Sequence, residues 1–308
     1  MKAGIEAERT RRVFLKSALA TAMLPFALNY PLKALERIVK TVPASGEALP
    51  AVGLGSWITF NVGDDPTGLA RSTEVMKAFF EAGGRLIDSS PMYGSSQSTI
   101  GFGLNALGRP EGLIAADKVW TSGDGESQIA ESTRHWGINQ FSLVQVHNLV
   151  DWQQHLPMLR EMKQAGALRY IGVTTSHGRR HRELENILSS QTIDFVQLTY
   201  NLADQDAENR LLPLAQERGV AVIANRPYQG GRLIRALKRE PLPNWATEAG
   251  LQTWADFALK YIISHPALTC AIPATTRVDH VQENMAACTG ELPEPNLRRR
   301  MVAYIEDL

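Results

Sequence analysis

Four residues whose side chains can share acid–base chemistry occur in order along the chain: Asp88, Tyr93, Lys118 and His147. A tyrosine hydroxyl can donate a proton, and a nearby lysine cation lowers the pKa of that hydroxyl by favouring the phenolate. An aspartate that pairs with the lysine fixes its position and keeps it charged. A histidine can donate a hydrogen bond to a carbonyl oxygen. Together these groups suit the protonation of a carbonyl oxygen as a hydride reaches its carbon.

Each of the four also has an ordinary structural explanation when it is taken alone. An aspartate at a strand end often caps a helix or a turn. A lone lysine or tyrosine is usually on the surface, and a buried histidine usually satisfies hydrogen bonds in a core. Four complementary groups at the ends of three successive predicted strands are harder to explain separately, so we treat them as one candidate catalytic group.

Short apolar runs that are typical of strands recur from residue 51 onward, most of them roughly 25–35 residues apart, the length of one strand–helix unit. The runs are 51–54, 85–88, 113–116, 141–146, 170–173, 194–198, 220–224 and 269–272. Stretches with helical periodicity lie between them. These are 66–82, 156–165, 183–189, 206–218, 254–264 and 278–287.

Strands that alternate with helices predict a parallel sheet, and eight such units favour an α/β fold closed into a (β/α)8 TIM barrel. No GxGxxG motif follows the first run, which argues against an open dinucleotide-binding sheet. Active sites of such barrels lie at the carboxyl ends of the strands. Asp88, Lys118 and His147 each follow such an end, so the barrel would direct them toward one mouth.

The segments around these residues resemble the aldo-keto reductase superfamily. The resemblance rests on 53–55, 85–94, 100–101, 118–120 and 144–147, in the family's order, and it covers about residues 50–290. It implies an NADP-dependent oxidoreductase that reduces an aldehyde or ketone to an alcohol. It also implies that Asp88, Tyr93, Lys118 and His147 are the catalytic tetrad, with Tyr93 as the proton donor.

The same resemblance implies that NADP(H) binds in an extended form across the barrel mouth. Thr174 and Thr175 after the fifth strand, and Gln197 on the sixth, match the family's contacts to the carboxamide. Arg226 stands where the family often has an aromatic ring, and its planar guanidinium can stack or reach the pyrophosphate. Gly230 allows the backbone to approach a phosphate closely.

The segment after the eighth strand resembles the family's adenosine-phosphate loop. Thr275 begins this loop, and the following helix N-terminus suits an anion. By the resemblance, Arg277 pairs with the 2′-phosphate, and Glu283 and Asn284 contact the adenine. Ala274 replaces a lysine that is common in the family, which leaves NAD as an alternative cofactor. A threonine here also fits plain helix capping.

The sequence does not predict which carbonyl compound is the substrate. The loops after the predicted strands carry side chains that suit a small-molecule pocket or simple packing. They are Trp57, Phe60, Trp120, Asn148, Trp152 and Tyr228.

The first 45 residues differ from the rest and predict a separate leader and linker, with the barrel spanning 46–308. Arg11 and Arg12 precede Phe14-Leu15-Lys16 and a short apolar stretch, a pattern that resembles a twin-arginine export signal. The pattern predicts the export machinery as a partner and a periplasmic location. An amphipathic helix packed on the barrel, or a leader retained at the membrane, is the alternative, and a cytoplasmic location stays open.

Composition limits the other classes of partner. Lys and Arg total 32 and Asp and Glu total 32, so no basic surface predicts nucleic acid or an anionic membrane. Two cysteines are too few for a disulfide framework or a thiolate metal site, and we expect no metal. Two other functions stay open: a barrel lyase with Lys118 as its Schiff-base nucleophile, and a non-catalytic NADP(H)-sensing subunit. The oligomeric state is not predicted.

Overall fold

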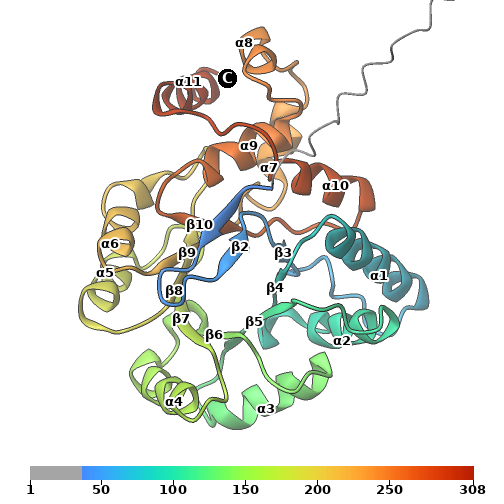
Figure 1. Cartoon of the computed structure of the whole chain (residues 1–308), viewed down its shortest axis with the longest axis vertical. Helices are drawn as coiled ribbons and strands as arrows, with labels where there is room; N and C mark the ends of the chain where they lie inside the picture. Colours follow the sequence, from blue (N-terminus) through green and yellow to red (C-terminus); the bar gives the residue numbers. More distant parts are fainter. Residues whose placement is uncertain (1–36) are drawn as a thin grey trace, which may run out of the picture. The chain divides into compact units, whose positions relative to one another are not determined.

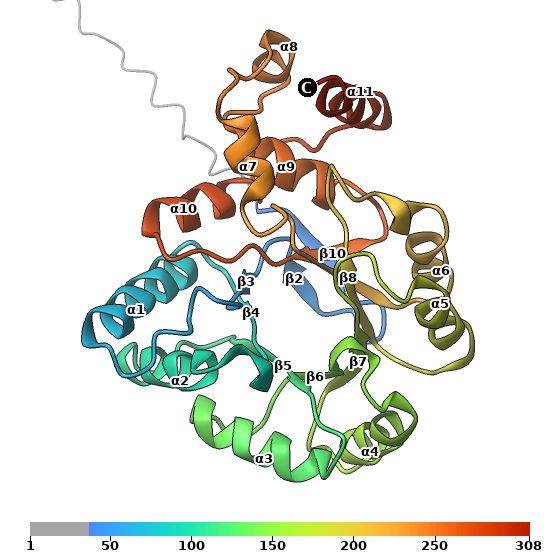
Figure 2. The same cartoon turned by 180° about the vertical axis from the view of Figure 1, so that it is seen from behind.

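The apolar runs predicted as barrel strands form one parallel sheet. The computed structural model describes residues 37–308. Its eight-stranded sheet follows chain order from β3 to β10, with helices around it (Figures 1 and 2). The strands are β3 (Leu54–Gly55), β4 (Leu86–Asp88), β5 (Ile114–Val119), β6 (Leu143–Val146), β7 (Tyr170–Thr174), β8 (Phe195–Thr199), β9 (Ala221–Asn225) and β10 (Leu268–Ala271).

Backbone contacts between the first and last strands close the sheet. Val52 forms a parallel bridge with Ala271. The amide of Gly53 donates to the carbonyl of Ala271 at 2.8 Å. A Cβ atom at Gly53 would lie 2.8 Å from the carbonyl oxygen of Leu86, so glycine is required at this crowded junction. The fold is therefore the (β/α)8 TIM barrel that the alternating pattern predicted.

Helices occupy all the stretches predicted as helical, and several more. The helices are α1 (Pro66–Glu81), α2 (Ser96–Ala106), α3 (Gly125–Trp136), α4 (Trp152–Gln164), α5 (His181–Ser190), α6 (Leu211–Glu217), α7 (Arg232–Leu237), α8 (Asn244–Glu248), α9 (Trp254–Ile263), α10 (Val278–Ala286) and α11 (Pro295–Glu306). Three 3₁₀ turns are η1 (Pro91–Tyr93), η2 (His147–Leu149) and η3 (Asp206–Glu208). Among the described residues no helix is long and apolar enough to cross a membrane.

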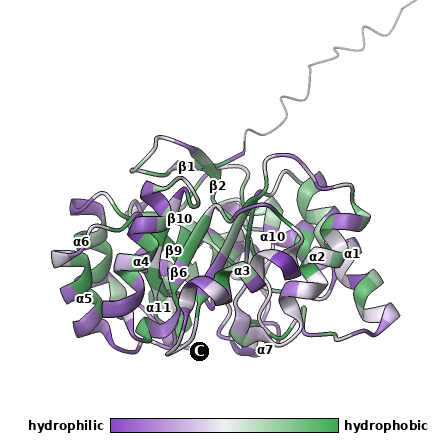
Figure 3. Cartoon of the chain, turned by 90° about the horizontal axis from the view of Figure 1, so that it is seen from below, coloured by the Kyte–Doolittle hydropathy of each residue, from purple (hydrophilic) through white to green (hydrophobic). Residues whose placement is uncertain are grey.

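Alternation along the strands divides the core into two layers. One face of the sheet packs against the surrounding helices, and the other fills the barrel interior with side chains such as Leu86, Leu143 and Phe195. The strands are accordingly the most apolar part of Figure 3. Because side chains alternate along a strand, the next interior positions toward the carboxyl ends are Asp88, Lys118 and Gln197.

An antiparallel hairpin, β1 (Val39–Thr41) with β2 (Ala48–Pro50), covers the amino-terminal end of the barrel. Leu49 is buried with the barrel-interior side chains. Glu47 accepts hydrogen bonds from Arg85, at 3.0 Å, and from Arg169. Figure 3 shows this hairpin at one end of the barrel and α7 at the other. The hairpin spans the predicted boundary at residue 45, and the predicted export signal lies outside the described residues.

Candidate active site

A buried ion pair lies at the carboxyl end of the barrel interior. Nζ of Lys118 lies 2.6 Å from Oδ2 of Asp88 and donates to the carbonyl of Ser89 at 2.7 Å. The other carboxylate oxygen of Asp88 accepts from the Gln197 amide at 2.8 Å. Burial by itself lowers the pKa of Lys118. The charge of Asp88, and at high pH that of the Tyr93 phenolate, outweigh burial and raise that pKa. Lys118 therefore stays a cation, as the sequence-based interpretation required.

The ring of Tyr93 lies over this pair. Tyr93 ends the turn η1, whose first residue, Pro91, and capping residue, Ser90, suit the start of a helical turn. Nζ of Lys118 is 5.2 Å from the centroid of the Tyr93 ring. Burial raises the pKa of Tyr93, while Lys118 acts to lower it. The lysine acts in the predicted direction, but burial is the larger effect, so the hydroxyl keeps its proton at neutral pH.

His147 stands beside Tyr93 in an edge-to-face arrangement, with 5.6 Å between the ring centroids. Nδ1 of His147 lies 2.7 Å from Oγ of Ser90. Burial, and then the Lys118 cation, lower the pKa of His147 to about 2. The imidazole is therefore neutral at physiological pH and can donate or accept a hydrogen bond.

The site contains a second buried carboxyl group, Asp117, that the sequence did not predict. It precedes Lys118 on β5 and points toward the helices, where Oδ2 accepts from the Gln97 amide at 2.8 Å. Its Oδ1 accepts from the backbone amide of Lys118 at 2.7 Å. Burial raises the pKa of Asp117 to about 7. An aspartate inside an apolar strand run is the signal that could have identified it.

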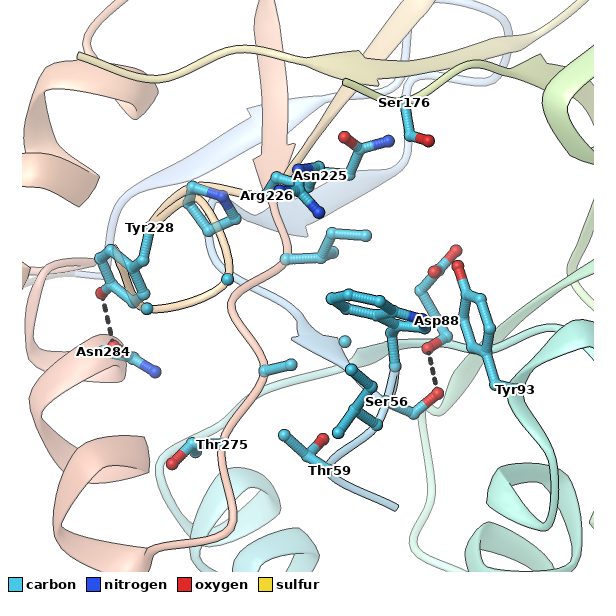
Figure 4. A pocket seen from close by; sticks show the side chains of 18 of the residues that line it. Ser56, Thr59, Asp88, Tyr93, Ser176, Asn225, Arg226, Tyr228, Thr275 and Asn284 are labelled. Atoms are coloured by element: carbon cyan, nitrogen blue, oxygen red, sulfur yellow. Dashed lines mark hydrogen bonds between the residues drawn. The ribbon is translucent and has the colours of Figure 1, made fainter. Parts of the chain in front are cut away.

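A cavity of about 480 Å³ opens above these groups (Figure 4). Asp88, Tyr93 and His147 line it, and three side chains at its mouth are exposed and apolar: Trp57, Ile58 and Met92. Its volume lies in the range of small-molecule and cofactor sites. The ion pair and the tyrosine therefore face a space that can hold a ligand.

Most of the predicted cofactor-binding residues line this cavity, but two do not. Those that line it are Thr174, Gln197, Arg226, Gly230, Thr275, Glu283 and Asn284. Thr175 is buried outside the lining, and its carbonyl accepts from Asn225 at 2.8 Å. The guanidinium of Arg277 is 61% exposed and pairs with Asp279 instead of facing the cavity.

Several polar contacts organise the cavity wall. Asn225, at the end of β9, accepts from Thr199 at 2.7 Å and was not predicted, although its place at a strand end was a usable signal. The Tyr228 hydroxyl donates to Asn284 at 2.6 Å, as Figure 4 shows. Thr275 accepts from the backbone amide of Arg277 at 3.1 Å, which is a turn contact before α10. The N-cap of α10 is Arg277, which makes no side-chain capping bond, so the capping explanation does not hold for Thr275.

The predicted pocket side chains fall into two groups. Trp57, Asn148 and Tyr228 line the cavity. The other three lie outside this lining. Phe60 is buried in the hydrophobic core, Trp120 is 40% exposed, and Trp152 donates to Glu183 at 2.9 Å.

Comparisons with known proteins agree on one family. The model of the aldo/keto reductase family matches residues 51–300. Methylglyoxal reductase YeaE of Escherichia coli is 28% identical over 275 residues, which cover 86% of this chain and 95% of that protein. The NADH-specific methylglyoxal reductase of the same organism is 24% identical, over 84% of this chain and 96% of its own length.

A solved structure shares the fold. The aldo/keto reductase of Klebsiella pneumoniae in complex with NADP and acetate superposes with a TM-score of 0.74 at 22% identity. The match covers 88% of this chain and 96% of that one. At this identity the likeness supports the barrel fold alone.

Proposed function

The chain belongs to the aldo/keto reductase family, and on that premise we propose that it reduces an aldehyde or ketone to an alcohol with NADPH. One observation carries the proposal: a buried Asp88–Lys118 ion pair lies beneath a protonated Tyr93 at the floor of a ligand-sized cavity. That arrangement places a proton donor and a fixed cation beside the space where a carbonyl group would bind.

The residues of the site have complementary tasks in this reaction. Tyr93 transfers its hydroxyl proton to the substrate oxygen, and the phenolate that remains is stabilised by the Lys118 cation. Asp88 and the Ser89 carbonyl hold that cation in place. His147, neutral and at the cavity wall, hydrogen-bonds the carbonyl oxygen. The bound nicotinamide cofactor supplies the hydride.

The lining of the cavity fits such a cofactor. Thr174, Gln197 and Asn225 present hydroxyl and amide groups that can hold a carboxamide. The cations of Arg226, Arg235 and Lys238 suit phosphate groups; all three line the cavity. These cations suit the pyrophosphate that NADPH and NADH share, so the choice of NADPH rests on Arg277 as the candidate for the 2′-phosphate.

The nature of the substrate is the next part of the proposal. Two relatives are named as methylglyoxal reductases. The apolar mouth formed by Trp57, Ile58 and Met92 suits the apolar part of a small carbonyl compound. Methylglyoxal and other small aldehydes are therefore the first substrates to test.

Purified protein titrated with NADPH should change the nicotinamide fluorescence, and carbonyl compounds should then oxidise the NADPH. The variant Tyr93→Phe should lower kcat at least about 100-fold, because the proton donor is lost, while the NADPH affinity changes little. Failure to bind NADPH or NADH would refute the proposal. Binding without turnover for any carbonyl compound would instead support a non-catalytic NADP(H)-sensing subunit.

The lyase alternative is disfavoured by the geometry of Lys118. Its Nζ is a buried cation held by Asp88 and the carbonyl of Ser89. A Schiff-base nucleophile must present a neutral amine to the substrate, and Lys118 is not among the cavity-lining residues.

A further inference from the structure

Ser90 makes the buried contact that holds His147. Its side chain is fully buried, and Oγ lies 2.7 Å from Nδ1 of His147. The same oxygen accepts a hydrogen bond from the backbone amide of Met92 at 3.2 Å. These two contacts allow the direction of the serine–histidine hydrogen bond to be worked out.

The direction follows from counting donors and acceptors. A serine hydroxyl carries one proton and can accept two hydrogen bonds. Oγ of Ser90 already accepts from Met92, and across residues 37–308 its other hydrogen-bonding neighbour is Nδ1 of His147. If Nδ1 carried the proton, Oγ would accept twice and its own buried proton would have no partner. The hydroxyl therefore donates to Nδ1, and Nδ1 carries the lone pair.

This direction fixes where the imidazole carries its proton. A neutral histidine with a lone pair on Nδ1 has its proton on Nε2. His147 lines the cavity, and within the part of the chain that the structure describes Nε2 has no protein hydrogen-bond partner. The Nε2–H group is therefore available to a ligand in the cavity.

We propose that Ser90 is a positioning residue that holds His147 in its Nε2–H form, so that the substrate oxygen receives a hydrogen bond from His147 and a proton from Tyr93. The proposal rests on the proposed reduction for its catalytic meaning. The assignment of the histidine proton stands on the structure and is measured without turnover. The proposal gives the hydrogen bond to His147 and the proton transfer to Tyr93, although either side chain could in principle perform either task.

The test combines nitrogen NMR with kinetics on the full chain. Protein labelled with ¹⁵N-histidine is measured at pH 7, and His147→Gln identifies the His147 signals among the seven histidines. We expect a pyridine-type Nδ1 and a pyrrole-type Nε2 in the wild type. A protonated Nδ1 in the wild type would overturn the proposal, whatever the activity of the protein.

Variants then connect the proton position to catalysis. Ser90→Ala should give a mixture of both neutral forms and a fall of about tenfold in kcat/KM, because the buried hydrogen bond to His147 is lost, together with the one from the Met92 amide. Ser90→Thr keeps the hydroxyl and should restore both readouts in large part. Ser142→Ala removes a buried hydroxyl near the other end of β6, bonded to Arg169 at 3.0 Å, and should change neither.

The outcomes separate this proposal from the proposed reduction. An unchanged NMR pattern or unchanged kcat/KM in Ser90→Ala would refute the positioning role. An equal loss in Ser142→Ala would show that general destabilisation explains the effect. Absence of carbonyl reduction in the wild type would refute the reduction alone, since the NMR result still decides the proton position.

Discussion

At the scale of the residue, burial and one ion pair set the protonation states of the groups in the site. Burial keeps Tyr93 protonated and His147 neutral, and an ion pair with Asp88 keeps Lys118 charged. A group that must donate a proton therefore has one at neutral pH. Burial decides the protonation state of Tyr93 and His147, whereas the partner carboxylate decides that of Lys118.

Asp117 gives the clearest pH-dependent prediction. Its pKa is raised to about 7 in the folded chain, against about 4 in an unfolded one. Between these pH values the folded state holds a proton that the unfolded state has released. This stabilising contribution is complete below pH ~4 and is lost as the pH rises to about 7, with a slope of up to about 1.4 kcal/mol per pH unit.

The variant Asp117→Asn has no such titration. Its free energy of unfolding, measured with urea from pH 4 to 8, should increase relative to that of the wild type as the pH rises to 7 and should then stay level. Asp124→Asn, at an exposed helix cap on α3, is a control that should not reproduce this rise. A constant difference between Asp117→Asn and the wild type across this range would contradict the shifted pKa.

The four-residue group could be predicted at this scale because each member lies at, or just after, the end of a strand that the apolar pattern identifies. Asp117 and Asn225 each left only the signal of a polar residue in or at the end of an apolar strand run. Their roles come from burial and from partners distant in sequence, which the sequence does not show. The orientation of the Arg277 side chain could not be predicted either, since its ion pair with Asp279 is a surface interaction that no periodicity indicates.

At the scale of the element, the sequence predicted all eight barrel strands but missed several helices, among them α2 and α3. Helix α2 contains four weak helix formers, Ser96, Ser98, Gly101 and Gly103. Its apolar residues are also not gathered on one face of the helix. It is held instead by packing between α1 and α3. Helix α3 could have been recognised, since Asp124 caps its start.

A substitution in the hairpin β1–β2 should change the stability of the protein without changing its activity. Leu49→Ala removes a buried side chain from the amino-terminal end of the barrel and should lower the free energy of unfolding by about 2–5 kcal/mol. Because the cavity is at the opposite end, kcat/KM at 25 °C should change less than about twofold. Val39→Ala, at a position 52% exposed, should change stability by less than about 0.5 kcal/mol.

Urea denaturation and initial rates measured on the same preparations check this prediction. A large loss of kcat/KM in folded Leu49→Ala would show that the two ends of the barrel are coupled. A loss of stability in Val39→Ala equal to that in Leu49→Ala would show that the hairpin does not depend on its buried residue.

At the scale of the whole molecule, parallel register accounts for the site. All eight strands point the same way, so their carboxyl ends meet around one cavity. Residues separated by more than 100 positions, such as Asp88 and Gln197, then bond directly. Once the sequence predicts a closed barrel, the location of its reactive end follows, whereas the cofactor contacts needed the family resemblance.

We propose that the whole molecule works in the periplasm. Arg11 and Arg12 are followed by Phe14-Leu15-Lys16, the pattern that resembles a twin-arginine signal. Such a route carries folded proteins, so a nicotinamide cofactor bound inside the barrel would travel with the chain. This would provide the cofactor in a compartment where no supply of it is expected.

Cell fractionation tests this proposal. The wild-type chain should be recovered in the periplasmic fraction, and the Arg11→Lys/Arg12→Lys variant should stay in the cytoplasmic fraction. The double variant keeps the charge and leaves the barrel residues untouched, so both proteins should reduce carbonyl compounds equally well after purification. Periplasmic protein should also release NADP(H) on denaturation, because the cofactor would have been bound before export. Wild-type protein confined to the cytoplasm would refute export, and exported protein without cofactor would refute its co-transport.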